Sequence, residues 1–366
     1  MTETLAATPL EAWHRQRGAT MAGFAGHLLP IAYPEGALAE HRACRTHAAL
    51  FDVSHMGQLE VAGDGAAAAL ERLIPADLEG LAVGRQRYAV FTTPEGGILD
   101  DLMIARLAPE RFFLVVNAAR READLAHLRH FLPPSLTLTP LSERALLALQ
   151  GPAAAALLGP LAPEAAALPY LGIVETQLLG VRARISRSGY TGEDGFEISL
   201  PAAQAIPLAE ALTDRGATPA GLAARDSLRL EAGLCLYGQD IDETTSPIEA
   251  GLAWTIPRRR RAAADFLGAE RILRELAEGP PRLRVGLRLE GRQPARAQSP
   301  VYCEGEEVGR VTSGGFSPTL EVAIAMALLD GRRAEASAFT LGVRGRLLPA
   351  RRVPFPFVPH RTVRRG

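Results

Sequence analysis

Residues 188–198 have the sequence Ser-Gly-Tyr-Thr-Gly-Glu-Asp-Gly-Phe-Glu-Ile, in which glycines are interspersed with hydrogen-bonding side chains. Apolar residues alternate before it, at 181–185, and after it, at 196–200, which predicts a strand, a tight turn and a second strand. The glycines permit positive φ and close approach to a neighbour. Two interpretations are open. The first is an ordinary polar hairpin, because turns favour these residue types for conformational reasons. Alternatively, the turn and Glu197 on the outgoing strand form a binding site.

The composition is that of a globular protein with two or three domains. The chain has 366 residues, of which 47% are hydrophobic and 22% charged, enough for a large buried core. The net charge of −1 gives no long-range field that would attract nucleic acid. No apolar run approaches the ~20 residues that a membrane helix needs. We therefore expect neither nucleic acid nor membrane among the partners.

The numbers of cysteines and lysines limit which kinds of covalent chemistry the protein can carry out. The three cysteines, Cys44, Cys235 and Cys303, lie far apart and form no C-x-x-C motif, which argues against a disulfide framework. Residues 1–21 contain no apolar signal segment, so we expect a cytoplasmic protein. The chain has no lysine, and all 40 basic residues counted are arginines. A Schiff-base lysine, a pyridoxal-phosphate lysine and a Walker-type lysine are thereby excluded.

We expect no metal site and no dinucleotide site. His127 and His130 share one face of a predicted helix, but no cysteine or second histidine pair accompanies them, so they are predicted to be surface residues. Residues 63–68, Gly-Asp-Gly-Ala-Ala-Ala, match G-x-G-x-x-A after a predicted strand. A dinucleotide fold requires a fully apolar strand before this motif and an acid about 20 residues after it. Neither is present.

Two adjacent acids stand inside a predicted strand. Residues 98–104 are Ile-Leu-Asp-Asp-Leu-Met-Ile, so Asp100 and Asp101 point to opposite faces. One of them faces the interior, where burial beside apolar neighbours shifts the pKa of a carboxyl group. The alternative is an acid on an edge strand that caps a neighbouring turn.

Helical spacing of apolar residues is predicted over residues 37–50, 118–131 and 222–233. In the last of these, Arg225 and Arg229 lie on one face because they are four residues apart. Two interpretations are open: both arginines are solvated, which is the usual outcome for such a pair, or they have a functional role. The four arginines at 258–261 predict a solvated face or a docking surface for an acidic partner.

The C-terminal part is predicted to be all-β. A linker, Gly279-Pro280-Pro281, precedes a change to short alternating segments and a hairpin turn at 304–306. The predicted strands cover residues 283–289, 301–303, 308–312 and 322–329.

Several segments in order along nearly the whole chain resemble one family, the aminomethyltransferase (T-protein) of the glycine cleavage system. They are 51–56 (Phe-Asp-Val-Ser-His-Met), 96–102 (Gly-Gly-Ile-Leu-Asp-Asp-Leu), 148–152 (Ala-Leu-Gln-Gly-Pro), 189–195 (Gly-Tyr-Thr-Gly-Glu-Asp-Gly), 221–242, and 311–314 (Val-Thr-Ser-Gly). The resemblance implies an α+β fold. It implies two interleaved, ferredoxin-like α/β lobes, which together form a discontinuous folate-binding region over residues 1–278. A C-terminal antiparallel β-barrel is expected over residues 282–366.

The resemblance also implies the reaction. An aminomethyl group is taken from the dihydrolipoyl arm of the lipoylated H-protein, ammonia is released, and 5,10-methylenetetrahydrofolate forms from tetrahydrofolate held in a central channel. Asp101 is implied to be catalytic, near the reactive folate nitrogen, where positioning and electrostatics suit a carboxylate. Asp100 is then expected to be the outward acid of the pair.

The folate contacts are carried over in the same way. A pterin presents an amidine-like N–H pair, which a carboxylate accepts as two parallel hydrogen bonds. The resemblance assigns that role to Glu197, with Tyr190 and Arg225 alongside. It places five further residues on the channel wall: Tyr88, Asn117, Met56, Trp254 and Arg296. Thr362 stands where the family often has a tyrosine, so that contact is not expected here.

Two rival functions remain as alternatives. One is a folate-binding protein of iron–sulfur assembly, whose relatives carry a K-G-C-Y-x-G-Q-E signature. Residues 233–240 instead are Gly-Leu-Cys-Leu-Tyr-Gly-Gln-Asp, without the lysine. The other is the folate subunit of an enzyme that oxidises dimethylglycine or sarcosine. That enzyme needs a dinucleotide domain, for which this length has no room, although a separate subunit could supply one.

Overall fold

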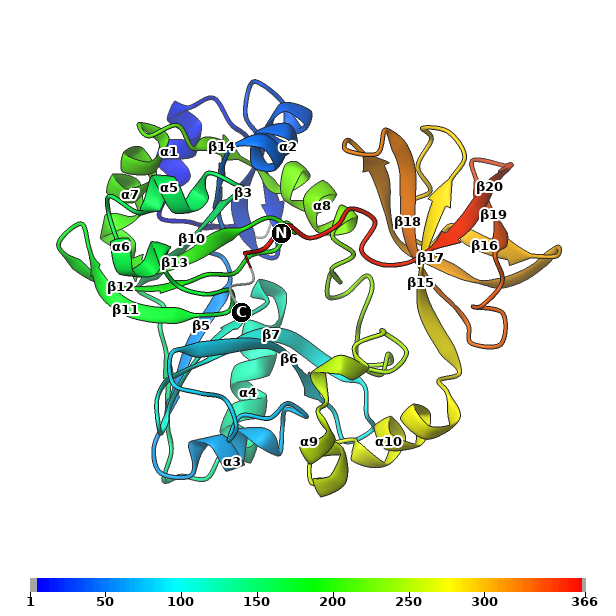
Figure 1. Cartoon of the computed structure of the whole chain (residues 1–366), viewed down its shortest axis with the longest axis horizontal. Helices are drawn as coiled ribbons and strands as arrows, with labels where there is room; N and C mark the ends of the chain where they lie inside the picture. Colours follow the sequence, from blue (N-terminus) through cyan, green and yellow to red (C-terminus); the bar gives the residue numbers. More distant parts are fainter. Residues whose placement is uncertain (1–4, 364–366) are drawn as a thin grey trace.

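The computed structural model describes residues 5–363. It has three parts, two sheet-containing lobes and a β-barrel, arranged around helix α8 (Figure 1). This arrangement confirms the predicted α+β class with a C-terminal antiparallel barrel.

The first lobe is built on a six-stranded sheet of order β11-β12-β13-β10-β4-β14. In chain order its strands are β4 (Ala49–Asp52), β10 (Arg144–Gln150), β11 (Ile173–Leu178), β12 (Val181–Ser186), β13 (Gly195–Pro201) and β14 (Thr218–Ala220). Its helices are α1 (Glu11–Gln16), α2 (Ala37–Thr46), α5 (Ala154–Leu158), α6 (Pro163–Ala166), α7 (Ala205–Thr213) and α8 (Leu222–Glu231). A small sheet of β1 (Ala6–Ala7), β2 (Thr20–Phe24) and β3 (His27–Ala32) adjoins it.

The second lobe is inserted into the first. Its five-stranded sheet has the order β6-β7-β8-β5-β9. The strands are β5 (Gly57–Ala62), β6 (Arg85–Thr92), β7 (Ile98–Ala108), β8 (Arg111–Val116) and β9 (Thr137–Pro140), with helices α3 (Ala66–Glu71) and α4 (Arg121–Phe131). Because β4 pairs with β10 across this whole insertion, the two lobes are interleaved along the chain.

The third part is a closed barrel of order β15-β18-β17-β16-β19-β20. Its strands are β15 (Arg282–Leu289), β16 (Pro300–Cys303), β17 (Glu306–Ser317), β18 (Val322–Asp330), β19 (Ala338–Val343) and β20 (Arg346–Val353). Helices α9 (Arg258–Ala263) and α10 (Ala269–Glu278) lead into it. The four predicted strands are present, and the last two were not predicted.

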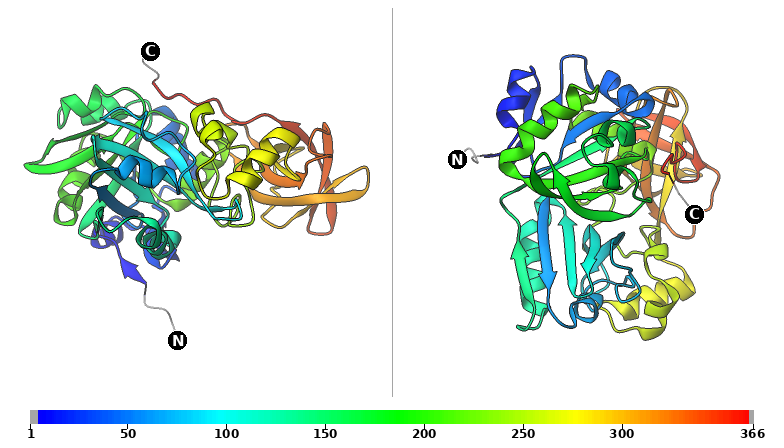
Figure 2. Two further views of the ribbon diagram at one scale, coloured as in Figure 1. Left: turned by 90° about the horizontal axis from the view of Figure 1, so that it is seen from below. Right: turned by 60° about the vertical axis from the view of Figure 1, so that its left-hand side comes forward.

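Each part has its own apolar core, and a further cluster joins the lobes. That cluster brings Phe51 of the first sheet against Phe113 of the second and Leu228 of α8. Helix α8 begins where a side chain would not fit, since a Cβ on Gly221 would lie 2.3 Å from the carbonyl oxygen of Ile31. After the barrel, the chain crosses back to the first lobe, as Figure 1 and the left view of Figure 2 show.

Three local predictions were wrong in part. The helix predicted over 37–50 ends at Thr46, and strand β4 begins at Ala49, because the apolar residues at its end enter the sheet core. His127 is half-buried, with its ring 5.5 Å from that of Phe91. Within the run 258–261, Arg260 is buried, because Glu71 and Asp265 pair with its guanidinium.

Candidate active site

Asp101 is held at both carboxylate oxygens. It lies on β7 opposite Val90 of β6. Oδ2 accepts a hydrogen bond from the Tyr88 hydroxyl at 3.0 Å, and Oδ1 accepts one from Asn117 Nδ2 at 2.8 Å. Burial raises the pKa of Asp101 to about 7, and the charge of Asp100 adds to this, while the bonds from Tyr88 and Asn117 oppose it. The group therefore changes protonation near neutral pH.

Asp100 is fully buried, so the expectation that it faces outward was wrong. It shares a side of the β7 strand with Leu102 and Ile104, which pack in the same core as Leu125 of α4. Both faces of this sheet are covered, one by helices and the other by the first lobe. Asp100 therefore points under α4, whereas Asp101 points toward the first lobe.

Asn117 connects the two acids. It follows β8, and its backbone N–H donates to Asp100 Oδ2 at 3.0 Å. Its side-chain Nδ2 lies 2.9 Å from Asp100 Oδ1 and 3.0 Å from the carbonyl oxygen of Asp101, besides its bond to Asp101 Oδ1. The asparagine amide thus fixes the rotamer of Asp101 and links it to Asp100.

Tyr88 and Trp254 form an aromatic wall next to Asp101. Their rings stack with centroids 5.7 Å apart and planes 26° apart, a favourable offset arrangement. Trp254 is 66% exposed. Burial raises the pKa of Tyr88 well above its usual value, with a further contribution from Asp101, so Tyr88 stays a proton donor to Asp101.

The stretch 188–198 forms a hairpin between β12 and β13, as predicted. Residues 187–194, here called the hairpin loop, are held by Gln150 at the end of β10. Gln150 Nε2 donates to the carbonyl oxygen of Ser188 at 2.9 Å, and its Oε1 accepts from the Thr191 hydroxyl at 2.8 Å. Arg187 and Asp194 close the loop with two parallel bonds of 2.9 and 2.6 Å. The loop is rigidly built, which suits a binding element better than a connector.

Tyr190 projects from this loop toward α8 and the segment after it. Its hydroxyl donates to the carbonyl oxygen of Cys235, and the guanidinium of Arg225 lies 4.7 Å from the centre of its ring, within cation–π range. The charge of Asp101 contributes to the raised pKa of Tyr190, after burial. Tyr190 therefore stands between the acid on β7 and the arginine on α8.

Glu197 and Arg225 face each other across an incompletely bonded space. Glu197 accepts one bond, at Oε2, from the Ser188 hydroxyl at 3.1 Å. Burial raises the pKa of Glu197, opposed by Arg225, and burial lowers the pKa of Arg225, opposed by Glu197. Within residues 5–363, the buried Nη1 of Arg225 has no hydrogen-bond partner. A buried unpaired donor is costly, so this set fits a ligand that brings both acceptors and donors.

The remaining predicted residues do not all join this group. Met56 is half-buried and packs in the cluster between the lobes. Arg296 is exposed on the barrel, 3.4 Å from the carbonyl oxygen of Gly314. Thr362 lies in the C-terminal tail. The structure thus brings together six of the predicted residues, Tyr88, Asp101, Asn117, Tyr190, Glu197 and Arg225, with Trp254 at their edge.

Two residues near this group were not predicted. His55 is buried, and its pKa is lowered to about 4 by burial and then by the charge of Arg225, so it is neutral. Asp124 is buried under β7 beside Asp100. His55 stands in a motif already noted, whereas Asp124 sits in a helix turn where an acid is usually solvated, so the sequence offered no signal for it.

Within the described part of the chain, no group of three or more His, Cys, Asp or Glu residues is placed to hold a metal ion. No helix among residues 5–363 is long and apolar enough to cross a membrane.

Comparison with known proteins defines the class. Residues 10–260 match the GCVT N-terminal domain, and residues 282–359 match the glycine cleavage T-protein C-terminal barrel domain. The crystal structure of glycine cleavage system aminomethyltransferase T from Bartonella henselae superposes with a TM-score of 0.92 at 42% identity, covering 98% of this chain and 99% of that one.

Curated relatives agree over nearly their whole lengths. An aminomethyltransferase of Rubrobacter xylanophilus is 45% identical over 357 residues, covering 97% of this chain and 94% of the relative. A probable mitochondrial aminomethyltransferase of Schizosaccharomyces pombe is 43% identical over 362 residues, covering 97% and 93%. The chain therefore belongs to the glycine cleavage T-protein family and is an aminomethyltransferase.

Proposed function

We propose that the protein takes an aminomethyl group from the lipoylated H-protein, releases ammonia, and forms 5,10-methylenetetrahydrofolate from tetrahydrofolate. The observation that carries this proposal is the placement of Asp101. A carboxyl group held at both oxygens faces a loop tyrosine, and a carboxylate–arginine pair with unused hydrogen-bonding capacity lies beyond it.

Glu197, Arg225 and Tyr190 bind and orient the folate in this proposal. Glu197 accepts from the N–H groups of the pterin, a pairing that is stronger when the acceptor is ionised. Arg225 donates from its unpaired Nη1, and its charge opposes the rise that burial causes in the pKa of Glu197. When bound, tetrahydrofolate supplies the amine nitrogens that receive the one-carbon unit. The rigid hairpin loop fixes the ligand, so little ordering is needed on binding.

Asp101 acts on the charge that develops at the reacting atoms. Its pKa of about 7 lets it hold a proton or a negative charge at working pH, which is the condition for an efficient acid–base group. Tyr88 and Asn117 occupy both oxygens and prevent the carboxyl group from rotating away. Trp254 and Tyr88 limit the access of water from one side.

The two rival functions are disfavoured by the relatives, which are aminomethyltransferases matched along nearly the whole chain. For location, we propose the cytoplasm, because Cys44, Cys235 and Cys303 are free and buried. Some relatives are mitochondrial proteins, so their compartment differs.

The test is ammonia release from aminomethylated H-protein with and without tetrahydrofolate, together with folate binding followed by calorimetry. We expect folate-dependent release of ammonia and binding of one folate per chain. Binding without ammonia release would reduce the protein to a folate-binding relative. If Glu197→Ala releases ammonia and binds folate as the wild type does, folate does not bind at Glu197 and the proposed site is wrong.

A further inference from the structure

Asp124 is a buried acid that the proposed reaction does not use. It lies in the first turn of α4 and is fully buried. Neither of its oxygens has a hydrogen-bond donor from an amide, hydroxyl or guanidinium group within residues 5–363. Arg120, whose charge opposes the rise in the pKa of Asp124, is committed to the carbonyl oxygen of Leu99 at 3.0 Å and to Glu243. An ionised carboxylate in this setting would be strongly destabilising, so Asp124 carries a proton.

Asp100 is the carboxylate that acts on Asp124 both through its charge and through a side-chain hydrogen bond, so it is the acceptor for this proton. Asp124 and Asp100 are both fully buried, and each acts on the pKa of the other. Burial raises the pKa of Asp124 to about 10, and the charge of Asp100 and the hydrogen bond to it add to this. Burial also raises the pKa of Asp100, opposed by the bonds from Asp124 and Asn117. Two buried carboxyl groups that act on each other in this way share one proton and titrate as a pair.

The pair is connected to the reacting acid through one side chain. Asp100 accepts two bonds from Asn117, at 3.0 and 2.9 Å, and Asn117 donates to Asp101 at 2.8 Å. With the proton of Asp124 directed at Asp100, these bonds connect Asp124 through Asp100 and Asn117 to Asp101.

We propose that Asp124 and Asp100 form a proton-sharing carboxyl pair that positions Asn117 and, through it, Asp101. Asp124 and Asp100 are positioning residues, since neither faces the folate space. The pair has two effects. The donor on Asp124 orients Asp100, and the negative charge on Asp100 lies close enough to Asp101 to set the pH at which Asp101 titrates. The second effect rests on the proposed function, whereas the shared proton does not.

The other charged and titratable groups around the pair allow this assignment. Arg120 lies over the ring of Tyr237, with 5.2 Å between its guanidinium carbon and the ring centre, and Glu243 pairs with it. The pKa of Tyr237 is raised, first by burial, so it is neutral. On α4 itself, burial lowers the pKa of His127 to about 4, so it is also neutral. Arg120 is thus the one charged group among these that is not an acid, and its charge is offset by Glu243.

The first test detects the proton without any ligand. Infrared difference spectra of the full chain, wild type against Asp124→Asn, are recorded at about pH 8.5, where Asp101 is ionised and Asp124 is not. We expect a protonated carboxyl band in the wild type that Asp124→Asn removes. Absence of that band would overturn the shared proton, whether or not the enzyme turns over.

The second test separates positioning from bulk stability. Asp124→Asn keeps a donor toward Asp100 and is expected to retain kcat within about three-fold, whereas Asp124→Leu removes the donor and is expected to lower kcat by about ten-fold or more. The folate dissociation constant should change by less than about two-fold in both, because the folate space is untouched. Glu122→Gln, an exposed acid in the same turn, is the matched control. Equal kcat for Asn and Leu at position 124 would show a merely structural role.

The third test reads the charge of Asp100. In Asp100→Asn, the acidic limb of the kcat profile is expected to move down by about one pH unit, because a like charge near Asp101 is gone. If it stays in place, the electrostatic part of the proposal is wrong. A wild type that binds folate but releases no ammonia would refute the proposed function, and the infrared result would still decide the carboxyl pair.

Discussion

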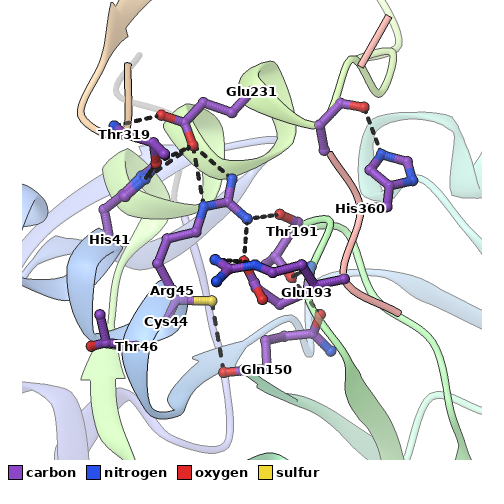
Figure 3. Close-up of polar contacts among 12 residues, drawn as sticks. His41, Cys44, Arg45, Thr46, Gln150, Thr191, Glu193, Glu231, Thr319 and His360 are labelled. Carbon is purple, nitrogen blue, oxygen red and sulfur yellow. Dashed lines mark hydrogen bonds and ion pairs between the residues drawn. The ribbon is translucent and has the colours of Figure 1, made fainter. Parts of the chain in front are cut away.

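Arg361, near the end of the chain, donates from Nε and Nη2 to Oε1 of Glu193, at 3.0 and 2.5 Å. The same oxygen accepts from Arg45 of α2 at 2.7 Å. The backbone N–H of Arg361 also donates to the carbonyl oxygen of Gly192 at 2.8 Å. The C-terminal tail, which leaves the barrel and returns to the first lobe, is thus fastened to the hairpin loop that carries Tyr190 (Figures 1 and 3).

Arg361→Ala is expected to affect folate binding more than stability. The Arg361 side chain is half exposed, so its ion pair is expected to contribute less than about 1 kcal/mol to the free energy of unfolding. Release of the tail loosens the hairpin loop, and we expect folate affinity to fall by about two- to five-fold as the loop must be ordered on binding. Chemical denaturation and calorimetry measure the two. Arg351→Ala, whose closest acid is 3.9 Å away and exposed, is the control and should change neither.

Arg45→Met is expected to be far more damaging than Arg361→Ala. Arg45 bridges two buried acids, Glu193 at 2.7 Å and Glu231 at 2.7 Å, as Figure 3 shows. Its removal leaves buried Glu231 without a guanidinium and Glu193 with only the half-exposed Arg361. Breaking a buried pair in this way typically costs about 3–5 kcal/mol. Urea denaturation checks this value. A loss below about 1 kcal/mol would mean that water or His41 compensates for the missing guanidinium.

Stability should fall in acid through Glu231. Burial alone would raise the pKa of this group, but hydrogen bonds and charges from His41, Ser317 and Arg45 lower it to about 2. A carboxyl group whose pKa is depressed on folding stabilises the protein above its unfolded pKa and loses that contribution as the pH falls toward the folded value. The loss should therefore develop between about pH 4.5 and pH 2. Thermal unfolding across that range should be less pH-dependent in Glu231→Gln, and an equal slope in both proteins would refute the assignment.

The fold was largely predictable because the family motifs recur in order along the chain. What the sequence missed has physical reasons. Strands β19 and β20 were not predicted. In β20, three arginines, Pro349 and an exposed Leu347 break the apolar–polar alternation. The inward position of Asp100 was missed because a period of two assigns opposite faces but not what covers each. Arg45 pairs with Glu193 and Glu231, which lie 148 and 186 positions further along the chain. A local sequence pattern cannot predict contacts over such separations.

The residues of the candidate site were predicted from the family resemblance, but the buried residues that hold them in place were not. Asp101, Glu197, Arg225 and Tyr190 stand in quoted motifs. Asp124 depends on a tertiary contact between α4 and β7, where helix spacing alone predicts a solvated acid. Burial of Arg229 with Asp240 is a similar case, since only the fold shows that the face of α8 shared with Arg225 is covered.

Gly189→Ala is expected to disrupt the hairpin loop. An added Cβ would lie 1.7 Å from Oε1 of Gln150, which anchors the loop at Ser188 and Thr191. Either Gln150 or the loop must move, and we expect a loss of about 2–4 kcal/mol in the free energy of unfolding together with weaker folate binding. Gly180→Ala is the control. No atom lies within 4 Å of its added Cβ, although its φ of +79° carries strain, so it should cost only about 1 kcal/mol.

Asp101→Asn and Glu197→Ala should separate chemistry from binding. Asn at position 101 keeps the shape of the side chain and an acceptor for Asn117, and its Nδ2 can donate to the Tyr88 hydroxyl. It cannot carry the charge or exchange the proton. We therefore expect kcat to fall by about 10²-fold or more with folate affinity nearly unchanged. Glu197→Ala removes the acceptor for the pterin and leaves Arg225 buried without its acid, so folate affinity should fall by about 10-fold or more. At saturating folate, its kcat should be closer to the wild type. Steady-state kinetics and calorimetry on both variants decide the matter, because equal losses of affinity would show that Asp101 and Glu197 share one binding role.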